Sequence, residues 1–428
     1  MQYSNIFVII FFVSSFLNFL LEMILEFVDF SFRKKHGMEI PDEVKGLIDE
    51  STLKKTCAYE NVKYKFWIPR FVLMFALELY LIIAGFYPAV FETVCSWSGN
   101  SIVVNLLYIF FTSIPTAILS IPFNLYSTFG IEKQFGFCKQ TFRMWIVDSI
   151  KSILVTFVIA LPLLAIACAL FKHCPNLWWL FLGATYVVFS LAISVIYPIL
   201  IAPIFNKFTP LEEGELKTRL ESLLQRCGFK SSGLFVMDAS KRSGHSNAYF
   251  TGFGKSKRVV LYDTLIEQLT PEEIEAVLGH ELGHYKHHHI VKRMCIMIPL
   301  IFAVLFAESI FIKMPELYEG FGFQILTNEN GDVSYKMMMV GTIFSATIFG
   351  GLAPLASLIT NHMSRRDEFQ ADAFSAKVCK KGAPLISALI KLNKENLSEI
   401  QVAKVYSAFK YSHPPLLERI EAIKETEK

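Results

Sequence analysis

A histidine, a glutamate and a second histidine stand at a spacing that suits metal-dependent hydrolysis. They form the pattern H-E-x-x-H as His280, Glu281 and His284. Residues four apart share one face of a helix, so the two imidazoles can hold one ion, and zinc is the ion that this motif binds in peptidases. Glu281 leaves the helix near the same face and can take a proton from water without being a ligand itself. The pattern therefore predicts zinc-dependent peptide hydrolysis.

The residues before the motif predict that it lies two to three turns inside a helix. Thr270 suits the N-cap, Pro271 the first helical position and Glu273 the third, which completes a capping box. An apolar stripe follows at Ile274, Val277 and Leu278. An ordinary amphipathic helix with surface histidines is the alternative. Three further histidines, 287–289, are interpreted as a polar helix end rather than as a second metal site.

A carboxylate that could complete the metal site occurs far downstream of the motif. A catalytic zinc site takes three protein ligands and keeps a further position open. Glu368 and Asp372 are four residues apart and project from one helix face. Glu368 could bind the ion while Asp372 orients a ligand histidine. A solvated, salt-bridged helix start is the competing interpretation of this segment.

The composition is that of a membrane protein. Of the 428 residues, 53% are hydrophobic and only 18% are charged, against about 25% charged in soluble domains. The net charge of +3 gives no basic footprint, so no nucleic-acid partner is expected. The eight cysteines contain no C-x-x-C pair, which leaves histidines and carboxylates as the candidate metal ligands.

Seven apolar segments are long enough to cross a bilayer, which takes about 20 residues. They are 3–27, 67–91, 101–126, 150–171, 177–205, 291–312 and 337–360. The expected fold class is therefore a membrane α-helical protein with seven transmembrane helices and a small cytoplasmic α+β zinc-peptidase domain. Residues 1–205 would hold the first five helices, 206–290 the metalloprotease region, 291–360 the last two helices, and 361–428 a C-terminal cytoplasmic segment with the third zinc ligand.

The charges of the loops predict the orientation. The first and third loops are rich in lysine and arginine, whereas the second has neither and the fourth has only Lys172. Cytoplasmic loops carry the excess of positive charge, so the odd-numbered loops should face the cytoplasm. The fifth loop carries the H-E-x-x-H motif, and we expect a multi-pass protein in contact with membrane lipid whose active site faces the cytoplasm.

A small α+β unit is expected between the fifth apolar segment and the motif helix. Residues 234–237, 247–253 and 257–262 read as strands, and 209–212 as a capped helix start. In zinc peptidases an extended substrate adds to an edge strand near the metal through backbone hydrogen bonds. Asn247, Ala248 and Tyr249 are the candidate edge, and an ordinary hairpin would give the same pattern.

Taken together, these motifs resemble the Ste24 family of integral-membrane zinc metalloproteases, the CAAX prenyl protease 1 family. The matching segments are 245–250 (HSNAYF), 259–265 (VVLYDTL), 278–284 (LGHELGH), 364–374 (SRRDEFQADAF) and 411–419 (YSHPPLLER). The resemblance covers most of the chain, including the number of apolar segments. It implies seven helices that enclose a large chamber, with one zinc ion near the cytoplasmic end.

The resemblance also implies roles for individual residues. His280, His284 and Glu368 would bind zinc, Glu281 would be the catalytic base, and Asn247 and Ala248 would lie beside the substrate. His413 and Arg419 would approach the site from the C-terminal segment. His413 is our candidate donor to the tetrahedral oxyanion. Arg365 and Arg419 are both candidates for anchoring the substrate or supporting the ligand carboxylates, and these alternatives stay open.

The substrates implied are proteins that end in a prenylated cysteine followed by three residues, of which the enzyme removes the last three. The implied membrane is the endoplasmic reticulum in a eukaryote and the inner membrane in a bacterium. A broader quality-control zinc protease, as in the related HtpX family, would need the same zinc site and is the alternative function.

Overall fold

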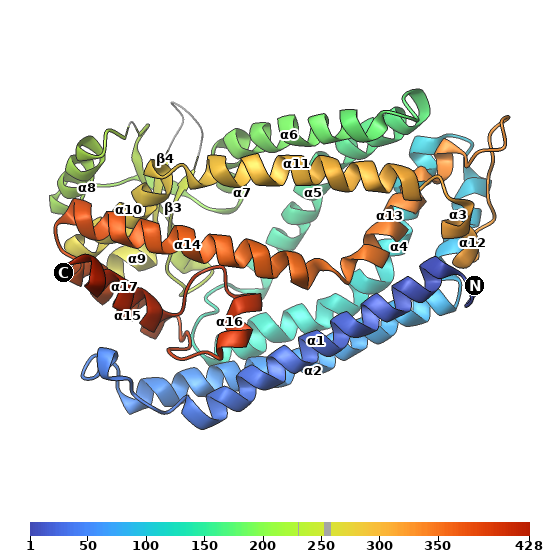
Figure 1. The fold of residues 1–428 in the computed structure, drawn as a ribbon. Coiled ribbons are helices and arrows are strands. Elements are labelled where there is room, and N and C mark those ends of the chain that lie inside the picture. The colour runs from blue at the N-terminus through green and yellow to red at the C-terminus, as the bar shows by residue number, and fades with distance from the viewer. Residues whose placement is uncertain (230, 252–257) are drawn as a thin grey trace.

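The computed structural model describes residues 1–229, 231–251 and 258–428. Long helices run side by side along the molecule, and a small α+β unit caps one end of them (Figure 1). The N-terminus lies at the far end of the helices, whereas the C-terminus lies beside the α+β unit (Figure 1). The strand expected at 247–253 and the one expected at 257–262 each extend partly beyond the described residues.

The helices expected to span the membrane are present. Within the described chain, six are long and apolar enough to cross a membrane: α1 (Ile6–His36), α2 (Glu50–Ile83), α4 with the turns after it (Ser101–Glu132), α5 (Phe142–His173), α6 with α7 (Trp178–Phe205) and α11 (His289–Phe311). The seventh expected span is a broken pair, α13 (Met338–Gly350) and α14 (Ala353–Cys379), which meet at 69°. The second span lies earlier than predicted, because Gly85 takes a left-handed conformation (φ 68°) and ends α2 before α3 (Phe86–Trp97) begins.

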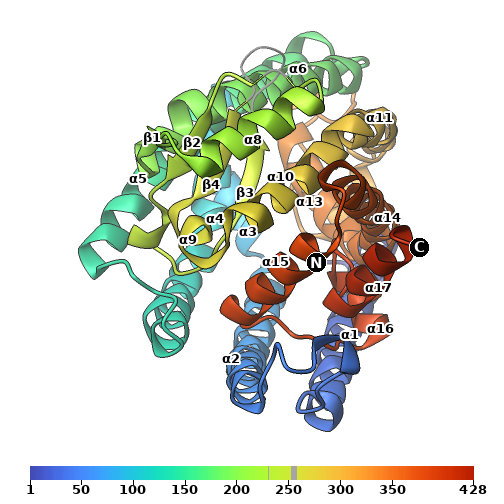
Figure 2. The same ribbon diagram turned by 90° about the vertical axis from the view of Figure 1, so that its left-hand side faces the viewer.

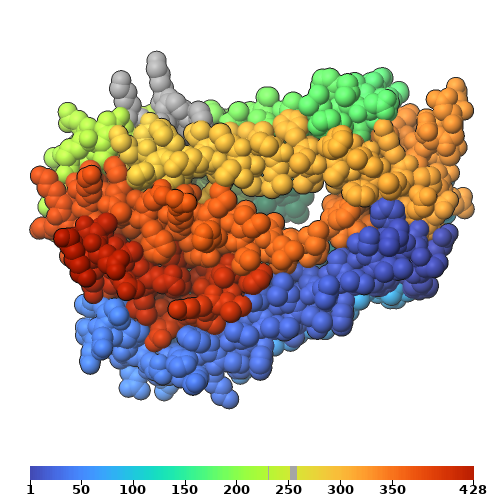
Figure 3. Space-filling model, in the orientation of Figure 1, coloured from blue at the N-terminus to red at the C-terminus, as the bar shows by residue number. Residues whose placement is uncertain are grey.

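The spans are arranged in a ring (Figure 2), and most of their apolar surface is not buried within the protein. Only 6–17% of the most apolar window of each of the six spans is buried, within the described residues. Viewed along their axes, the spans form a ring (Figure 2), and the surface is open between α11 and the bend from α13 to α14 (Figure 3). Buried apolar clusters lie at the two ends, around Phe11 and Tyr108 at one and Leu261 and Leu282 at the other. Figure 3 therefore shows an opening between spans, and the large chamber implied by the resemblance stays a prediction.

The α+β unit contains a mixed sheet. Among the described residues its strands are β1 (Phe208–Pro210), β2 (Leu234–Met237), β4 (Arg258–Tyr262) and β3 (Ala248–Thr251), in that spatial order. β2 and β4 are parallel and the other two pairings are antiparallel. The helix start predicted at 209–212 is wrong, because this segment pairs with β2, and α8 (Glu215–Arg226) begins only after Gly214. β3 is at the edge of the sheet, and no described strand pairs with its other side.

The motif helix is α10 (Pro271–Lys286), and it packs along α14. Thr270 and Glu273 form the predicted capping box at its start. Two glycines allow the close approach. A Cβ at position 283 would lie 2.7 Å from the Cα of Ala371, and one at position 279 would lie 2.9 Å from Ser375 Oγ. The backbones of α10 and α14 can therefore meet close to the predicted metal ligands.

The C-terminal segment folds back over α14 and is tied to the first span. Its helices are α15 (Ala383–Glu395), α16 (Lys404–Lys410) and α17 (Leu416–Thr426). Arg33 of α1 is buried, and its NH1 lies 2.7 Å from Asp29 Oδ2 and 2.5 Å from Glu399 Oε1. Tyr406 of α16 donates a hydrogen bond of 3.1 Å to Glu26. These contacts fix the segment that carries His413 against the membrane helices.

Candidate active site

Helices α10 and α14 bring the three predicted metal ligands together. The Nε2 atoms of His280 and His284 are 3.2 Å apart. Glu368 places Oε2 3.3 Å from His280 Nε2 and Oε1 3.3 Å from His284 Nε2. Ligand atoms on a tetrahedron with metal–ligand bonds of about 2.0–2.1 Å lie about 3.3 Å apart. The triangle of two imidazoles and one carboxylate therefore has the size and the chemistry of a three-ligand zinc site.

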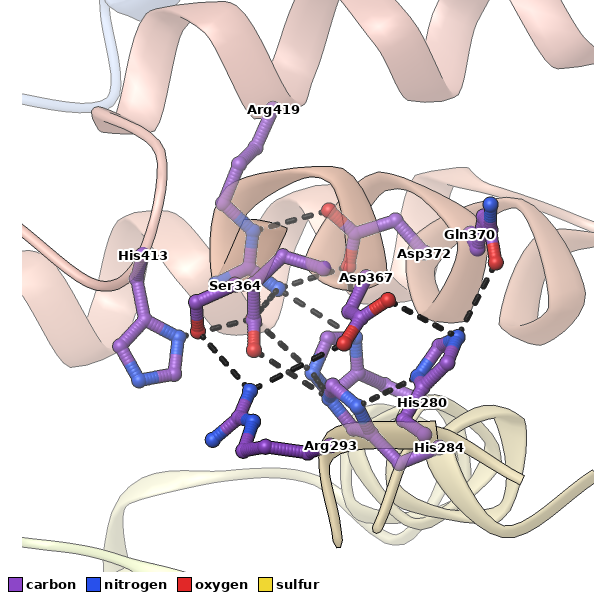
Figure 4. Close-up of polar contacts among 11 residues, drawn as sticks. His280, His284, Arg293, Ser364, Asp367, Gln370, Asp372, His413 and Arg419 are labelled. Atoms are coloured by element: carbon purple, nitrogen blue, oxygen red, sulfur yellow. Dashed lines mark hydrogen bonds and ion pairs between the residues drawn. The ribbon is translucent and has the colours of Figure 1, made fainter. Parts of the chain in front are cut away.

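His280 is held from behind by Asp372, as the spacing predicts. Its Nδ1 lies 2.7 Å from Asp372 Oδ1, and both side chains are buried. A proton on Nδ1 leaves the Nε2 lone pair directed at the ligand triangle, which is the arrangement found around catalytic metals. Figure 4 shows Asp372 between His280 and Arg419.

Arg419 supports this carboxylate. Its Nε donates to Asp372 Oδ2 at 2.8 Å and its NH2 donates to Oδ1 at 2.6 Å. Such a two-point contact fixes the plane of the carboxylate as well as its charge. The sequence left two roles open for Arg419, anchoring the substrate or supporting the carboxylates around the metal ligands. The contact with Asp372 corresponds to the supporting role.

Arg365 lies on α14 and does not contact the ligand triangle through any described hydrogen bond. Its NH1 donates to the carbonyls of Ser407, Ala408 and Tyr411, at 3.0, 3.2 and 2.9 Å. These carbonyls belong to the end of α16 and to the loop after it. Arg365 therefore fastens the segment that leads to His413, and it is neither a contact of Asp372 nor placed as a substrate anchor.

His413 reaches the site from the loop between α16 and α17. Its Nδ1 lies 2.8 Å from Glu368 Oε2, and 65% of its side chain is exposed. An exposed imidazole beside the metal ligands can swing toward a substrate, whereas Asp372 and Arg419 are enclosed by protein. This position agrees with a donor to the reacting carbonyl.

Glu281 lies beside the triangle without belonging to it. Burial raises the pKa of its carboxyl above the ordinary value, while the nearby imidazoles of His280 and His284 act in the opposite direction. A carboxylate that is partly shielded from water is a stronger base than one at the surface. A role for Glu281 as proton acceptor therefore stays a prediction, and the direction of its pKa shift is compatible with that role.

The predicted substrate edge is next to the motif helix. β3 begins at Ala248 and packs against α10. The carbonyl of Asn247 accepts a hydrogen bond of 3.1 Å from the backbone of Tyr262, and Tyr249 pairs with Val260 across the sheet. One side of β3 is thus used inside the sheet, and an extended peptide can add on the other side.

His289 is a feature that the sequence motifs did not reveal. The interpretation of 287–289 as a polar helix end is wrong for this residue, since only 2% of His289 is exposed. Its Nδ1 lies 3.0 Å from Nδ1 of the ligand His284. The contact depends on a left-handed turn at His288 (φ 54°) between α10 and α11, and no periodic pattern predicts it.

Comparison with known proteins gives matches over nearly the whole chain. The model of peptidase family M48 matches residues 210–427, and the model described as CAAX prenyl protease N-terminal, five membrane helices, matches residues 29–207. The CAAX prenyl protease 1 homolog of Oryza sativa subsp. japonica is 36% identical over 396 residues, which are 91% of each chain. CAAX prenyl protease 1 of Saccharomyces cerevisiae is 34% identical over 92% of this chain and 90% of its own. The crystal structure of S. mikatae Ste24p superposes with a TM-score of 0.91 at 32% identity, covering 97% of this chain and 99% of that one.

Fold and site together define a metallopeptidase built into a membrane. The chain belongs to the CAAX prenyl protease 1 (Ste24) family within peptidase family M48. The names of these relatives do not favour the quality-control alternative of the HtpX type.

Proposed function

We propose that this protein removes the C-terminal tripeptide from prenylated CAAX proteins, with one zinc ion held by His280, His284 and Glu368. The observation that carries the proposal is the cluster of these three side chains, in which the imidazole nitrogens lie 3.2 Å apart and each lies 3.3 Å from one of the two Glu368 oxygens, close to the spacing of ligand atoms around tetrahedral zinc. The donor set of two imidazoles and one carboxylate is that of known zinc peptidases. The names of the relatives supply the substrate class.

Each residue of the site has a separate role in hydrolysis. Zinc, when bound, polarises the scissile carbonyl and makes water more acidic. Glu281 accepts the proton of the attacking water and passes it to the leaving amine. His413 donates a hydrogen bond to the oxygen on which negative charge develops. Asp372 keeps His280 in the tautomer that leaves Nε2 free, and Arg419 keeps Asp372 in place.

The substrate is held as an added strand along β3. Asn247, Ala248 and Tyr249 provide the backbone edge, which lies against α10 and hence beside the ligand histidines. The opening between α11 and the bend from α13 to α14 (Figure 3) would admit the lipid that a prenylated substrate carries. A substrate anchored in the membrane can thus present its C-terminus to a site at the end of the spans.

The active site faces the cytoplasm in this proposal. The basic first loop and the basic third loop lie at the same end of the helices as the α+β unit (Figure 1). Positively charged loops remain on the cytoplasmic side. The membrane is the endoplasmic reticulum if the source is eukaryotic and the inner membrane if it is bacterial.

The test uses the purified full chain in lipid nanodiscs with a farnesylated C-a-a-X peptide and the same peptide without the lipid, followed by mass spectrometry. We expect release of the C-terminal tripeptide from the farnesylated peptide alone, and release slowed roughly 10²–10⁴-fold with Glu281→Gln. Equal cleavage of both peptides would contradict the substrate class. Cleavage by Glu281→Gln at the wild-type rate would contradict the proposed site.

A further inference from the structure

We propose that His289 is a positioning residue that fixes the ring and the proton of the ligand His284. The proposal rests on the metal site described above and concerns a residue outside it. His280 has a carboxylate partner, Asp372, but among the described contacts of His284 Nδ1 the partner is another imidazole. A ligand histidine without a partner on its second nitrogen would be free to rotate, so the identity of this partner affects how tightly the metal is held.

The protons along this contact can be placed by elimination. If His284 binds the ion through Nε2, its neutral ring carries a proton on Nδ1. This nitrogen lies 3.0 Å from His289 Nδ1, which must therefore accept the hydrogen bond. A proton on His289 Nδ1 would set two N–H groups against each other. His289 consequently carries its own proton on Nε2.

The far side of His289 agrees with this assignment. Its Nε2 lies 3.0 Å from Gln370 Oε1, an oxygen that can only accept. Asp367 Oδ1 is a second acceptor at 3.5 Å. His284 Nδ1 thus donates to His289 Nδ1, and His289 Nε2 donates to Gln370 Oε1. Each contact pairs one donor with one acceptor.

The surroundings hold His289 in this position. The residue is buried, and its ring makes a stacked contact with His287, with centroids 5.5 Å apart and planes at 14°. His288 occupies the left-handed region (φ 54°, ψ 35°), which turns the chain sharply enough to return the side chain of residue 289 toward α10. His289 is also the first residue of α11, so the partner of a metal ligand is built into the beginning of a membrane span.

The test compares variants that differ in the acceptor at position 289. His289→Phe keeps a planar ring but has no acceptor, whereas His289→Asn places an amide oxygen near the position of Nδ1. His288→Asn is the matched control, because His288 is exposed and asparagine tolerates the left-handed conformation. The affinity for Zn²⁺ is measured by competition with a chromophoric chelator, the visible spectrum of the Co²⁺ form reports ligand geometry, and melting of the metal-free protein reports folding.

We expect roughly 10–100-fold weaker Zn²⁺ binding and a changed Co²⁺ spectrum for His289→Phe. His289→Asn should recover most of the affinity, and His288→Asn should equal the wild type. Wild-type affinity in His289→Phe would overturn the inference while the proposed function stood. Equal losses in His289→Phe and His289→Asn would also overturn it, because a change of packing alone would then explain both.

Variants at Gln370 and His284 separate failure of this inference from failure of the proposed metal site. If His289→Phe does not accumulate as folded protein, a leucine variant that combines Gln370→Leu with Asp367→Leu removes both acceptors of His289 Nε2, while Gln370→Glu with Asp367 unchanged retains both. Weaker Zn²⁺ binding in the leucine variant only is expected, and unchanged binding in it would overturn the inference. Wild-type affinity in His284→Ala would instead show that the proposed metal site, and with it this inference, is wrong.

Discussion

Replacing Gly283 by alanine tests whether the close approach of α10 and α14 creates the metal site. The new Cβ would lie 2.7 Å from Ala371 Cα and 3.0 Å from Ala371 O, whereas ordinary contacts begin at 3.4 Å. The helices must therefore separate locally by about 0.7 Å, the difference between 3.4 and 2.7 Å. Zinc–ligand distances tolerate only about 0.2 Å. Glu368 lies one turn before Ala371, so it would move out of reach of the ion bound by the two histidines.

Overpacking of this kind costs about 1–3 kcal/mol. If that cost falls on the metal-bound form, the Zn²⁺ dissociation constant rises roughly 5–150-fold. Chelator competition on the purified full chain measures the affinity, and cleavage of the farnesylated peptide measures the consequence. Gly350→Ala is the matched control, because a Cβ there meets nothing within 4 Å, and it should leave both quantities unchanged.

A double variant separates the backbone contact from a side-chain contact. The two shortest contacts of the new Cβ at position 283 are with the Cα and the carbonyl oxygen of Ala371, which glycine also has, whereas the methyl carbon of Ala371 lies farther away, at 3.2 Å. Ala371→Gly should therefore not rescue Gly283→Ala. Wild-type Zn²⁺ affinity in Gly283→Ala would refute the reasoning, and full rescue by Ala371→Gly would show that the spacing is set by the methyl group of residue 371.

Three further predictions concern the catalytic groups. Glu281→Gln should keep one Zn²⁺ per chain but lose roughly 10²–10⁴-fold in turnover, as measured by peptide cleavage and metal analysis, since the proton acceptor is lost; a variant that loses its zinc would speak against a role as base alone. Removal of zinc by a chelator should abolish cleavage, and stoichiometric Zn²⁺ should restore it in the wild type but not in His280→Ala. Arg365→Met should leave the Zn²⁺ affinity unchanged but lower kcat roughly 10–100-fold, because the segment before His413 is released from its three carbonyl contacts; an unchanged kcat would mean that His413 needs no such support.

Much of the site followed from rules that act within one element. The four-residue spacing of His280 and His284 places both rings on one helix face wherever that helix lies, and the capping box at Thr270 fixes where it begins. The same spacing relates Glu368 to Asp372. The spans followed from length and composition, since a bilayer demands both.

Predictions from local sequence failed where contacts with a neighbouring strand or helix determine the secondary structure or the contacts of a side chain. Residues 209–212 resemble a helix start, but pairing with β2 made 208–210 a strand. The sequence pattern gave Arg365 and Arg419 the same two possible roles, substrate anchor or support of the ligand carboxylates. Only the folded chain shows that Arg365 contacts carbonyls of the C-terminal segment and that Arg419 contacts Asp372.

The sequence by itself determined which side chains can bind a metal and which segments can lie in lipid, because spacing along a helix and apolar length are properties of the chain alone. The tertiary structure decided which of these groups meet. Glycine at 283 allows two helix backbones to come into contact, and a left-handed turn at His288 brings His289 back to His284, a predicted metal ligand. Both depend on packing between elements distant in the sequence, and such packing leaves no periodic signal to read.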